Sequence, residues 1–110
     1  MRKVFVSHPF ASDPNQNKKN VDEICKWIIE NGENVLPVSP IHLFSFVEDE
    51  KGIRDDIIAM CFDLIDICDE VWLIDMNDDS VGMAIEKNYA KLGNKIVRYY
   101  TYNGELVESK

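Results

Sequence analysis

The sequence predicts an α/β protein built on a single open, doubly wound parallel sheet of four to five strands flanked by helices. Short β-branched and aromatic runs alternate with longer segments whose apolar residues recur at helical spacing. The run at residues 71–74 is apolar without a break, as in strands covered on both faces. At 110 residues and 45% hydrophobic content, the chain fits one domain, residues 1–110. We expect the strand order 2-1-3-4, with the first strand central.

The first third of the chain predicts a strand, a helix and a second strand. Residues 3–7 are typical of a strand, and the proline- and amide-rich segment 8–17 predicts turns. A helix follows to about Asn31, with one apolar stripe formed by Val21, Ile24, Cys25, Ile28 and Ile29. Residues 34–38 predict the second strand, and Pro37 places it at the sheet edge or at a strand end.

The middle of the chain is less regular. Residues 39–51 lack a clear period yet are rich in apolar side chains: Ile41, Leu43, Phe44, Phe46 and Val47. Such a segment is a lid, a surface for a partner, or a short helix on the core. Residues 52–68 then show apolar residues at helical spacing and predict a second long helix.

The last third predicts two more strands of the parallel sheet. Residues 70–75 form the third strand, residues 80 to about 92 a helix, and residues 95–100 the fourth strand. Asn103-Gly104 is a strong signal for a tight turn. We therefore expect residues 105–107 to add a short fifth strand beside its neighbour.

The charge balance restricts the partners. The chain carries 20 acidic and 12 basic residues, a formal net charge of −8. A surface of this sign repels a phosphate backbone, so we expect no nucleic-acid partner. No apolar run approaches a membrane span, and the first residues lead into a strand rather than a secretory signal. We therefore expect a cytoplasmic protein with no membrane partner.

The cysteines and histidines do not predict a metal site. Three cysteines lie in helical apolar patterns without C-x-x-C spacing, which is typical of free, reduced thiols: Cys25, Cys61 and Cys68. His8 and His42 are far apart and flank no cysteine pair. The pattern therefore predicts neither a metal nor another cofactor.

A polar turn at residues 75–82 joins the third strand to a helix. Such junctions hold ligands in parallel α/β sheets, because the first N–H groups of the helix are unpaired and the positive end of the helix dipole lies at the helix N-terminus. Ser80 and Gly82 lie in this turn, and Glu86 follows about one helical turn later, where its carboxylate can point at a bound group. This arrangement suggests chemistry on a nucleotide or sugar. A structural interpretation stays open, with Ser80 as a helix cap and Glu86 as a solvated acid.

Three stretches carry a resemblance to a known family. They are Val-Phe-Val-Ser-His-Pro-Phe at residues 4–10, Cys-Asp-Glu-Val-Trp-Leu at residues 68–73, and Ser-x-Gly-Met-x-x-Glu-x-x-Tyr-Ala at residues 80–90, continued by Leu-Gly-Asn-Lys-Ile-Val. Together they resemble the nucleoside 2-deoxyribosyltransferase superfamily, which includes deoxynucleoside monophosphate N-glycosidases. The likeness is greatest to a small phage and bacterial branch and extends to about Tyr99. It implies a Rossmann- or flavodoxin-like fold.

The resemblance also implies roles for motif residues. In that superfamily the motif glutamate, here Glu86, attacks the anomeric carbon and forms a glycosyl-enzyme ester as the base departs. Ser80 falls where the monophosphate-preferring members have a phosphate-binding serine. Gly82 would let the backbone approach that ligand closely.

Further candidate ligand contacts follow the first and third strands, at the same rim of the sheet. After the first strand these are Ser7, His8, Pro9 and Phe10. Phe10 can stack on a base and His8 can donate to a phosphate or sugar, although a proline turn with a half-buried aromatic explains the same residues. After the third strand, Asp75 and Asp78 can hydrogen-bond a ribose or base.

One departure from the family pattern matters. The second carboxylate of the family, which helps to protonate or position the leaving base, lies two helical turns before the third strand. Cys61 occupies that position here and is at most a weak proton donor at neutral pH. Helical spacing turns the nearby Asp63 and Asp66 away from the face of Cys61. Another acid substitutes, or catalysis is weak, or the pocket only binds.

Three functions are therefore weighed. The first is an N-glycosidase or deoxyribosyltransferase-like enzyme acting on (deoxy)nucleoside monophosphates. The alternatives are a non-catalytic nucleotide-binding module and a protein-interaction domain that uses the apolar segment 41–47. The resemblance also implies a homodimer, with this segment or the helix at residues 52–68 packing across the two-fold axis. The segment can instead fold back as a lid over its own pocket.

Overall fold

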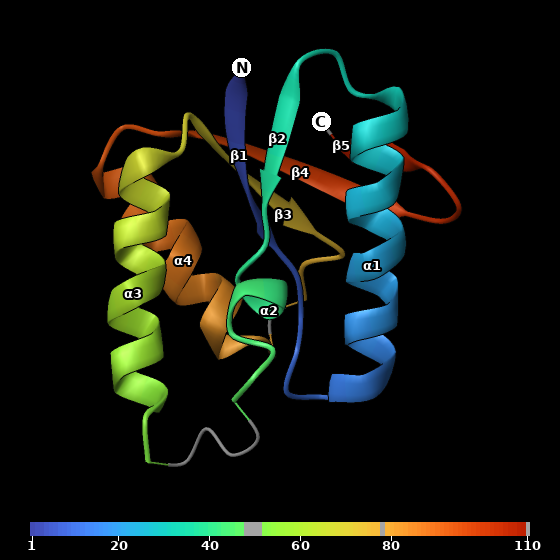
Figure 1. The fold of residues 1–110 in the computed structure, drawn as a ribbon. Coiled ribbons are helices and arrows are strands. Elements are labelled where there is room, and N and C mark those ends of the chain that lie inside the picture. Colours follow the sequence, from blue (N-terminus) through green and yellow to red (C-terminus); the bar gives the residue numbers. More distant parts are fainter. Residues whose placement is uncertain (48–51, 78, 110) are drawn as a thin grey trace.

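The computed structural model describes residues 1–47, 52–77 and 79–109, which contain a five-stranded sheet with the order β2-β1-β3-β4-β5 (Figure 1). Its strands are β1 (Arg2–Ser7), β2 (Val35–Val38), β3 (Glu70–Ile74), β4 (Ile96–Tyr102) and β5 (Leu106–Ser109). The first four are parallel, and β5 runs antiparallel to β4. The predicted fold class and strand order are confirmed, and the C-terminal hairpin makes the sheet mixed.

Helices cover both faces of the sheet. α1 (Pro14–Asn31) lies on one face, whereas α3 (Arg54–Ile67) and α4 (Val81–Leu92) lie together on the other (Figure 1). Because successive strand residues point to opposite faces, Val4 and Val6 pack with α1, whereas Phe5 packs with α3 and α4. Every residue of β3 is buried, which explains its unbroken apolar run.

α1 begins earlier than the sequence predicts. Its first residue is Pro14, and Asp13 caps it by accepting a hydrogen bond from the backbone N–H of Gln16 at 3.3 Å. An aspartate cap followed by proline in the first turn is a standard helix start. The polar amides after Pro14 suggest a turn by composition, but they form the first turn of the helix.

The segment after β2 folds into a short helix, α2 (Pro40–Leu43), capped by Ser39. α2 lies beyond the carboxyl ends of β1 and β2 (Figure 1). Ile41 and Phe44 pack against the core, whereas the side chains of Leu43 and Phe46 remain exposed. A short helix on the core is therefore confirmed for the first part of this segment, and β2 is an edge strand, as Pro37 indicates.

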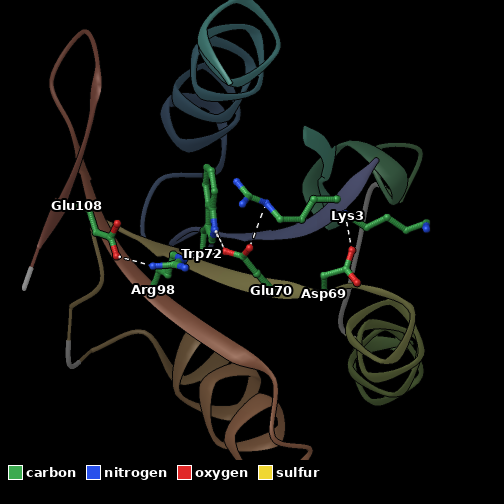
Figure 2. A network of polar contacts seen from close by, with 7 residues as sticks. Lys3, Asp69, Glu70, Trp72, Arg98 and Glu108 are labelled. Atoms are coloured by element: carbon green, nitrogen blue, oxygen red, sulfur yellow. Dashed lines mark hydrogen bonds and ion pairs between the residues drawn. The ribbon is translucent and has the colours of Figure 1, made fainter. Parts of the chain in front are cut away.

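A buried carboxylate is the centre of a polar network that spans four strands (Figure 2). Glu70, at the start of β3, is 2% exposed and accepts hydrogen bonds from Trp72 Nε1 at 3.0 Å and Arg98 Nε at 2.8 Å. Arg2 of β1 adds an ion pair at 3.0 Å, and Arg98 also reaches Glu108 of β5 at 3.2 Å. Burial alone would raise the pKa of Glu70, yet these donors outweigh it and lower the pKa. Glu70 is therefore a charged carboxylate inside the fold.

Two further expectations concern thiols and membranes. Cys25, Cys61 and Cys68 are thiols that form no disulfide within the described residues. None of the helices within the described ranges combines the length and hydrophobicity that a membrane span requires.

Candidate functional site

A cavity of about 790 Å³ opens at the carboxyl ends of the parallel strands. Its wall is formed by the loop after β1, the first turns of α1, the α2 segment, one side of α3, and the start of α4. β1 and β3 end side by side, with Ser7 paired to Leu73. The loops that follow these two strands are thereby brought together, at the rim where doubly wound sheets hold ligands.

A hydrogen bond links two of the sequence motifs, the one at residues 4–10 and the one at residues 80–90. Ser7 Oγ donates to Glu86 Oε1 at 2.8 Å, across a separation of 79 residues. Ser7 is buried, and Glu86 is half-buried and lines the cavity. Burial raises the pKa of Glu86 to about 7, while the hydrogen bond from Ser7 opposes that rise. The site therefore contains a carboxyl group that changes charge near neutral pH, a common property of functional acids.

The start of α4 also lines the cavity. Ser80 caps the helix, and its side chain accepts a hydrogen bond from the Met83 N–H at 3.4 Å. A Cβ atom added at Gly82 would meet no atom of the surrounding structure within 4 Å, so there is open space beside the first turn of α4. The structural interpretation of Ser80 as a cap is thus confirmed. The same residue still faces the cavity together with Gly82.

His8 is buried in the loop after β1 and lines the cavity with Pro9 and Phe10. Its Nδ1 donates to the Pro9 carbonyl at 2.7 Å, and Nε2 has no hydrogen-bond partner among the described residues. Burial lowers the pKa of His8, against the opposing effects of the Pro9 carbonyl and Asp75. The neutral ring therefore presents an acceptor at Nε2. The donor role predicted for His8 would require a second proton that burial disfavours.

The two aspartates after β3 are placed differently from the other candidates. Asp75 has a left-handed backbone, with a φ of 51°, and lies outside the cavity wall. Its Oδ1 accepts a hydrogen bond from the Tyr102 N–H at 3.0 Å, and its Oδ2 lies 3.9 Å from His8 Nε2. Asp75 therefore holds β3 against β4 in this structure. Asp78 lies outside the described residues.

The cavity wall includes Cys61, the residue that the resemblance aligns with a second carboxylate. Asp66 does not replace it, because both of its carboxylate oxygens accept hydrogen bonds from the Tyr89 hydroxyl, at 2.8 and 3.0 Å. Tyr89 also stacks on Phe62, with ring centroids 4.1 Å apart. The motif tyrosine therefore packs α4 against α3 and engages Asp66 of α3.

Sequence reasoning missed two cations of the wall, Lys18 of α1 and Arg54 of α3. Lys18 lies about one turn into α1, so its position on the cavity side follows only once the helix is known to begin at Pro14. Two basic side chains beside the cavity are notable in a chain with a net charge of −8, since they favour an anionic ligand. No group of three or more His, Cys, Asp or Glu side chains in the described ranges is arranged to hold a metal ion.

Residues 2–100 match the family profile described as "Domain of unknown function (DUF7768)". Among solved structures, the chain is similar to the 2-desoxiribosyltransferase from Leishmania mexicana, with a TM-score of 0.63 and 19% sequence identity. The match covers 94% of this chain and 66% of that chain, slightly less than two thirds of its length. No curated protein sequence matches the chain. At this identity, the likeness shows a shared α/β fold.

Proposed function

The chain belongs to the DUF7768 domain family, and we propose that it is a nucleotide N-glycosidase or deoxyribosyltransferase-like enzyme acting on (deoxy)nucleoside monophosphates. The observation that carries this proposal is the Ser7–Glu86 hydrogen bond, because it holds one carboxylate oxygen of Glu86, a residue of the cavity wall, from the buried side. The fold shared with a 2-desoxiribosyltransferase supports it.

The proposed reaction begins at the carboxylate of Glu86. Ser7 holds Oε1, and Oε2 attacks the anomeric carbon of the sugar as the bond between that carbon and the base nitrogen breaks. The electron pair of the broken bond leaves with the base, and a glycosyl ester of Glu86 forms. Water then releases the free sugar phosphate, or a second base takes the sugar, and in either case the carboxylate is regenerated.

A non-catalytic nucleotide-binding module is the second candidate. The observation that favours it is Cys61, which stands at the position where a second carboxylate would assist the leaving base. Incubation with a panel of nucleosides and nucleotides, followed by chromatography of free base, separates the candidates. Released base supports the enzyme, and a higher melting temperature without release supports the binding module. If neither base release nor a higher melting temperature is observed, the remaining candidate is a protein-interaction domain that uses the 41–47 segment.

A phosphate site at Ser80 and Gly82 makes a specific prediction. Ser80→Asp is expected to weaken binding of a deoxynucleoside monophosphate by at least about 1 kcal/mol, because a carboxylate would face the phosphate. Aspartate is also a good helix cap, so α4 should stay intact. Ser80→Asn is the uncharged control and should keep most of the affinity.

Calorimetric Kd values for the monophosphate and the matching nucleoside test this assignment. The Asp variant should bind the nucleoside as the wild type does. Equal affinity of the wild type for nucleoside and monophosphate would contradict the phosphate site.

We also propose a homodimer in which the 41–47 segment or α3 packs across the two-fold axis. Exposed apolar side chains on both elements support it, including Leu43 at 51%, Phe46 at 78% and Met60 at 48%. Light scattering at micromolar concentration should give twice the monomer mass of 12.7 kDa, and Phe46→Ser should reduce it. A monomer mass that dilution and nucleotide leave unchanged would favour the lid, since Ile41 and Phe44 line the cavity of their own chain.

A further inference from the structure

Four polar side chains meet between α1 and α2, behind the cavity wall. His42 Nδ1 lies 2.8 Å from Ser39 Oγ, and His42 Nε2 is hydrogen-bonded to Asp22 Oδ1 of α1. Ser39 Oγ also accepts the backbone N–H of His42 at 3.3 Å and hydrogen-bonds the thiol of Cys25. One imidazole thus joins the cap of α2 to the side of α1.

The partners determine where the protons are. A carboxylate only accepts, so Nε2 carries a proton and donates it to Asp22. In the neutral ring, Nδ1 accepts from the Ser39 hydroxyl, and in the charged ring it donates to the same oxygen. Both ring nitrogens are therefore engaged in either state, and the ring cannot turn without losing a partner.

The arrangement of serine, histidine and aspartate does not form a nucleophilic site. Neither Ser39 nor His42 belongs to the cavity wall, and the Ser39 oxygen already accepts a backbone N–H. Burial raises the pKa of Cys25 to about 11, which keeps its thiol protonated at neutral pH. The cluster is a connection between helices.

α2 depends on such a connection. It has four residues, and helices this short are not stable without tertiary contacts. Pro40, Ile41 and Phe44 of this segment line the cavity. We propose that His42 is a positioning residue, which through Asp22 and Ser39 holds α2 against α1 so that this segment forms the cavity wall. The kinetic part of the test rests on the proposed function.

Variants of Asp22 and His42 test the hydrogen-bonded connection between α1 and α2. Asp22→Ala and His42→Asn each remove the link to α1, and we expect them to raise KM for base release about five- to tenfold while kcat stays within about twofold. Asp22→Asn keeps an acceptor, and His42→Gln keeps a donor near Nε2, so both should restore part of the loss. Glu30→Ala removes an exposed ion pair with Lys26 on the same helix and should leave KM unchanged.

Hydrogen exchange provides a readout independent of catalysis. In the ligand-free protein, Asp22→Ala should speed amide exchange within residues 40–46 at least about tenfold, while exchange in β1 and β3 stays as in the wild type. Unchanged exchange in that segment, or faster exchange with an unchanged KM, would overturn the proposal. If the wild type releases no base, the proposed function fails. Amide exchange alone then supports or overturns the positioning role of His42.

Discussion

Glu86→Gln is expected to abolish base release and, at the same time, to make the folded protein more stable at alkaline pH. As the proposed nucleophile, Glu86 forms the bond to the sugar, and an amide cannot replace it. Removal of a nucleophile lowers kcat by a factor of about a thousand or more. In the wild type, base release should rise with pH around the raised pKa of about 7, because the reaction requires the ionised carboxylate.

The stability effect follows from the same burial. The pKa of Glu86 is raised from 4.5 to about 7, so below 4.5 the group is protonated in both states and does not oppose folding. As pH rises from 4.5 to 7, the unfolded chain loses the proton while the folded chain keeps it, and stability falls. Above 7 the penalty is complete, at up to about 3 kcal/mol. Glu86→Gln removes this penalty and can still accept the Ser7 hydrogen bond.

Urea unfolding of both proteins at pH 4 and pH 8 measures this difference. The free energy of unfolding of Glu86→Gln should exceed that of the wild type at pH 8 and equal it at pH 4. Glu30→Gln, which changes an exposed acid of α1, should equal the wild type at both pH values. Base release by the Gln variant at the wild-type rate would show that Glu86 is not the nucleophile. Equal stabilities at pH 8 would show that its carboxylate is hydrated in the folded state.

The fold could be predicted because its evidence is local. Strand and helix periods, the unbroken apolar run of β3 and the Asn103-Gly104 turn each lie within a short window of sequence. The rules for parallel sheets then led to the strand order that the structure confirms. The same turn predicted the fifth strand but not its direction in the parallel sheet, and the structure shows it antiparallel because a tight hairpin reverses the chain.

The candidate site was less predictable because its contacts are distant in sequence. The Ser7–Glu86 pair spans 79 residues, and the sequence placed the two residues on the same rim of the sheet without indicating that they pair. The sequence left open a solvated acid at Glu86, whereas the structure half-buries this carboxylate. Lys18 was missed because the start of its helix was placed too late.

The burial of Glu70 in the core could not be predicted from the local sequence either. An acid at the start of a strand indicates an exposed position, and no local pattern shows that Arg2 and Arg98 come from the two neighbouring strands to neutralise it. The burial of Glu70 leads to the second large effect that we expect. Glu70→Ala should destabilise the protein by about 3 kcal/mol, as is typical when one partner of a buried ion pair is removed.

Glu70→Ala removes several interactions at once. The Trp72 indole N–H, which donates to Glu70 at 3.0 Å within the core, would lack a partner, at about 1–3 kcal/mol. Arg2 and Arg98 would lose their shared carboxylate, although both are partly exposed and can reach water. Glu108→Ala is the matched control, since it removes a carboxylate from the same Arg98 at the exposed edge. That change should cost at most about 1 kcal/mol.

The pH dependence identifies charge as the cause. The pKa of Glu70 is lowered in the folded state, so its ionised form stabilises the fold above the unfolded value of 4.5, and this contribution is lost as pH falls through the lowered pKa. Glu70→Gln keeps the shape and an acceptor for Trp72, so its loss of stability should be smaller than that of Glu70→Ala and should shrink as urea unfolding is moved from pH 7 to pH 3. A loss for Glu70→Ala no larger than that for Glu108→Ala would mean that the buried carboxylate contributes no more than an exposed one, and the central role of Glu70 in the polar network of the four strands would be wrong.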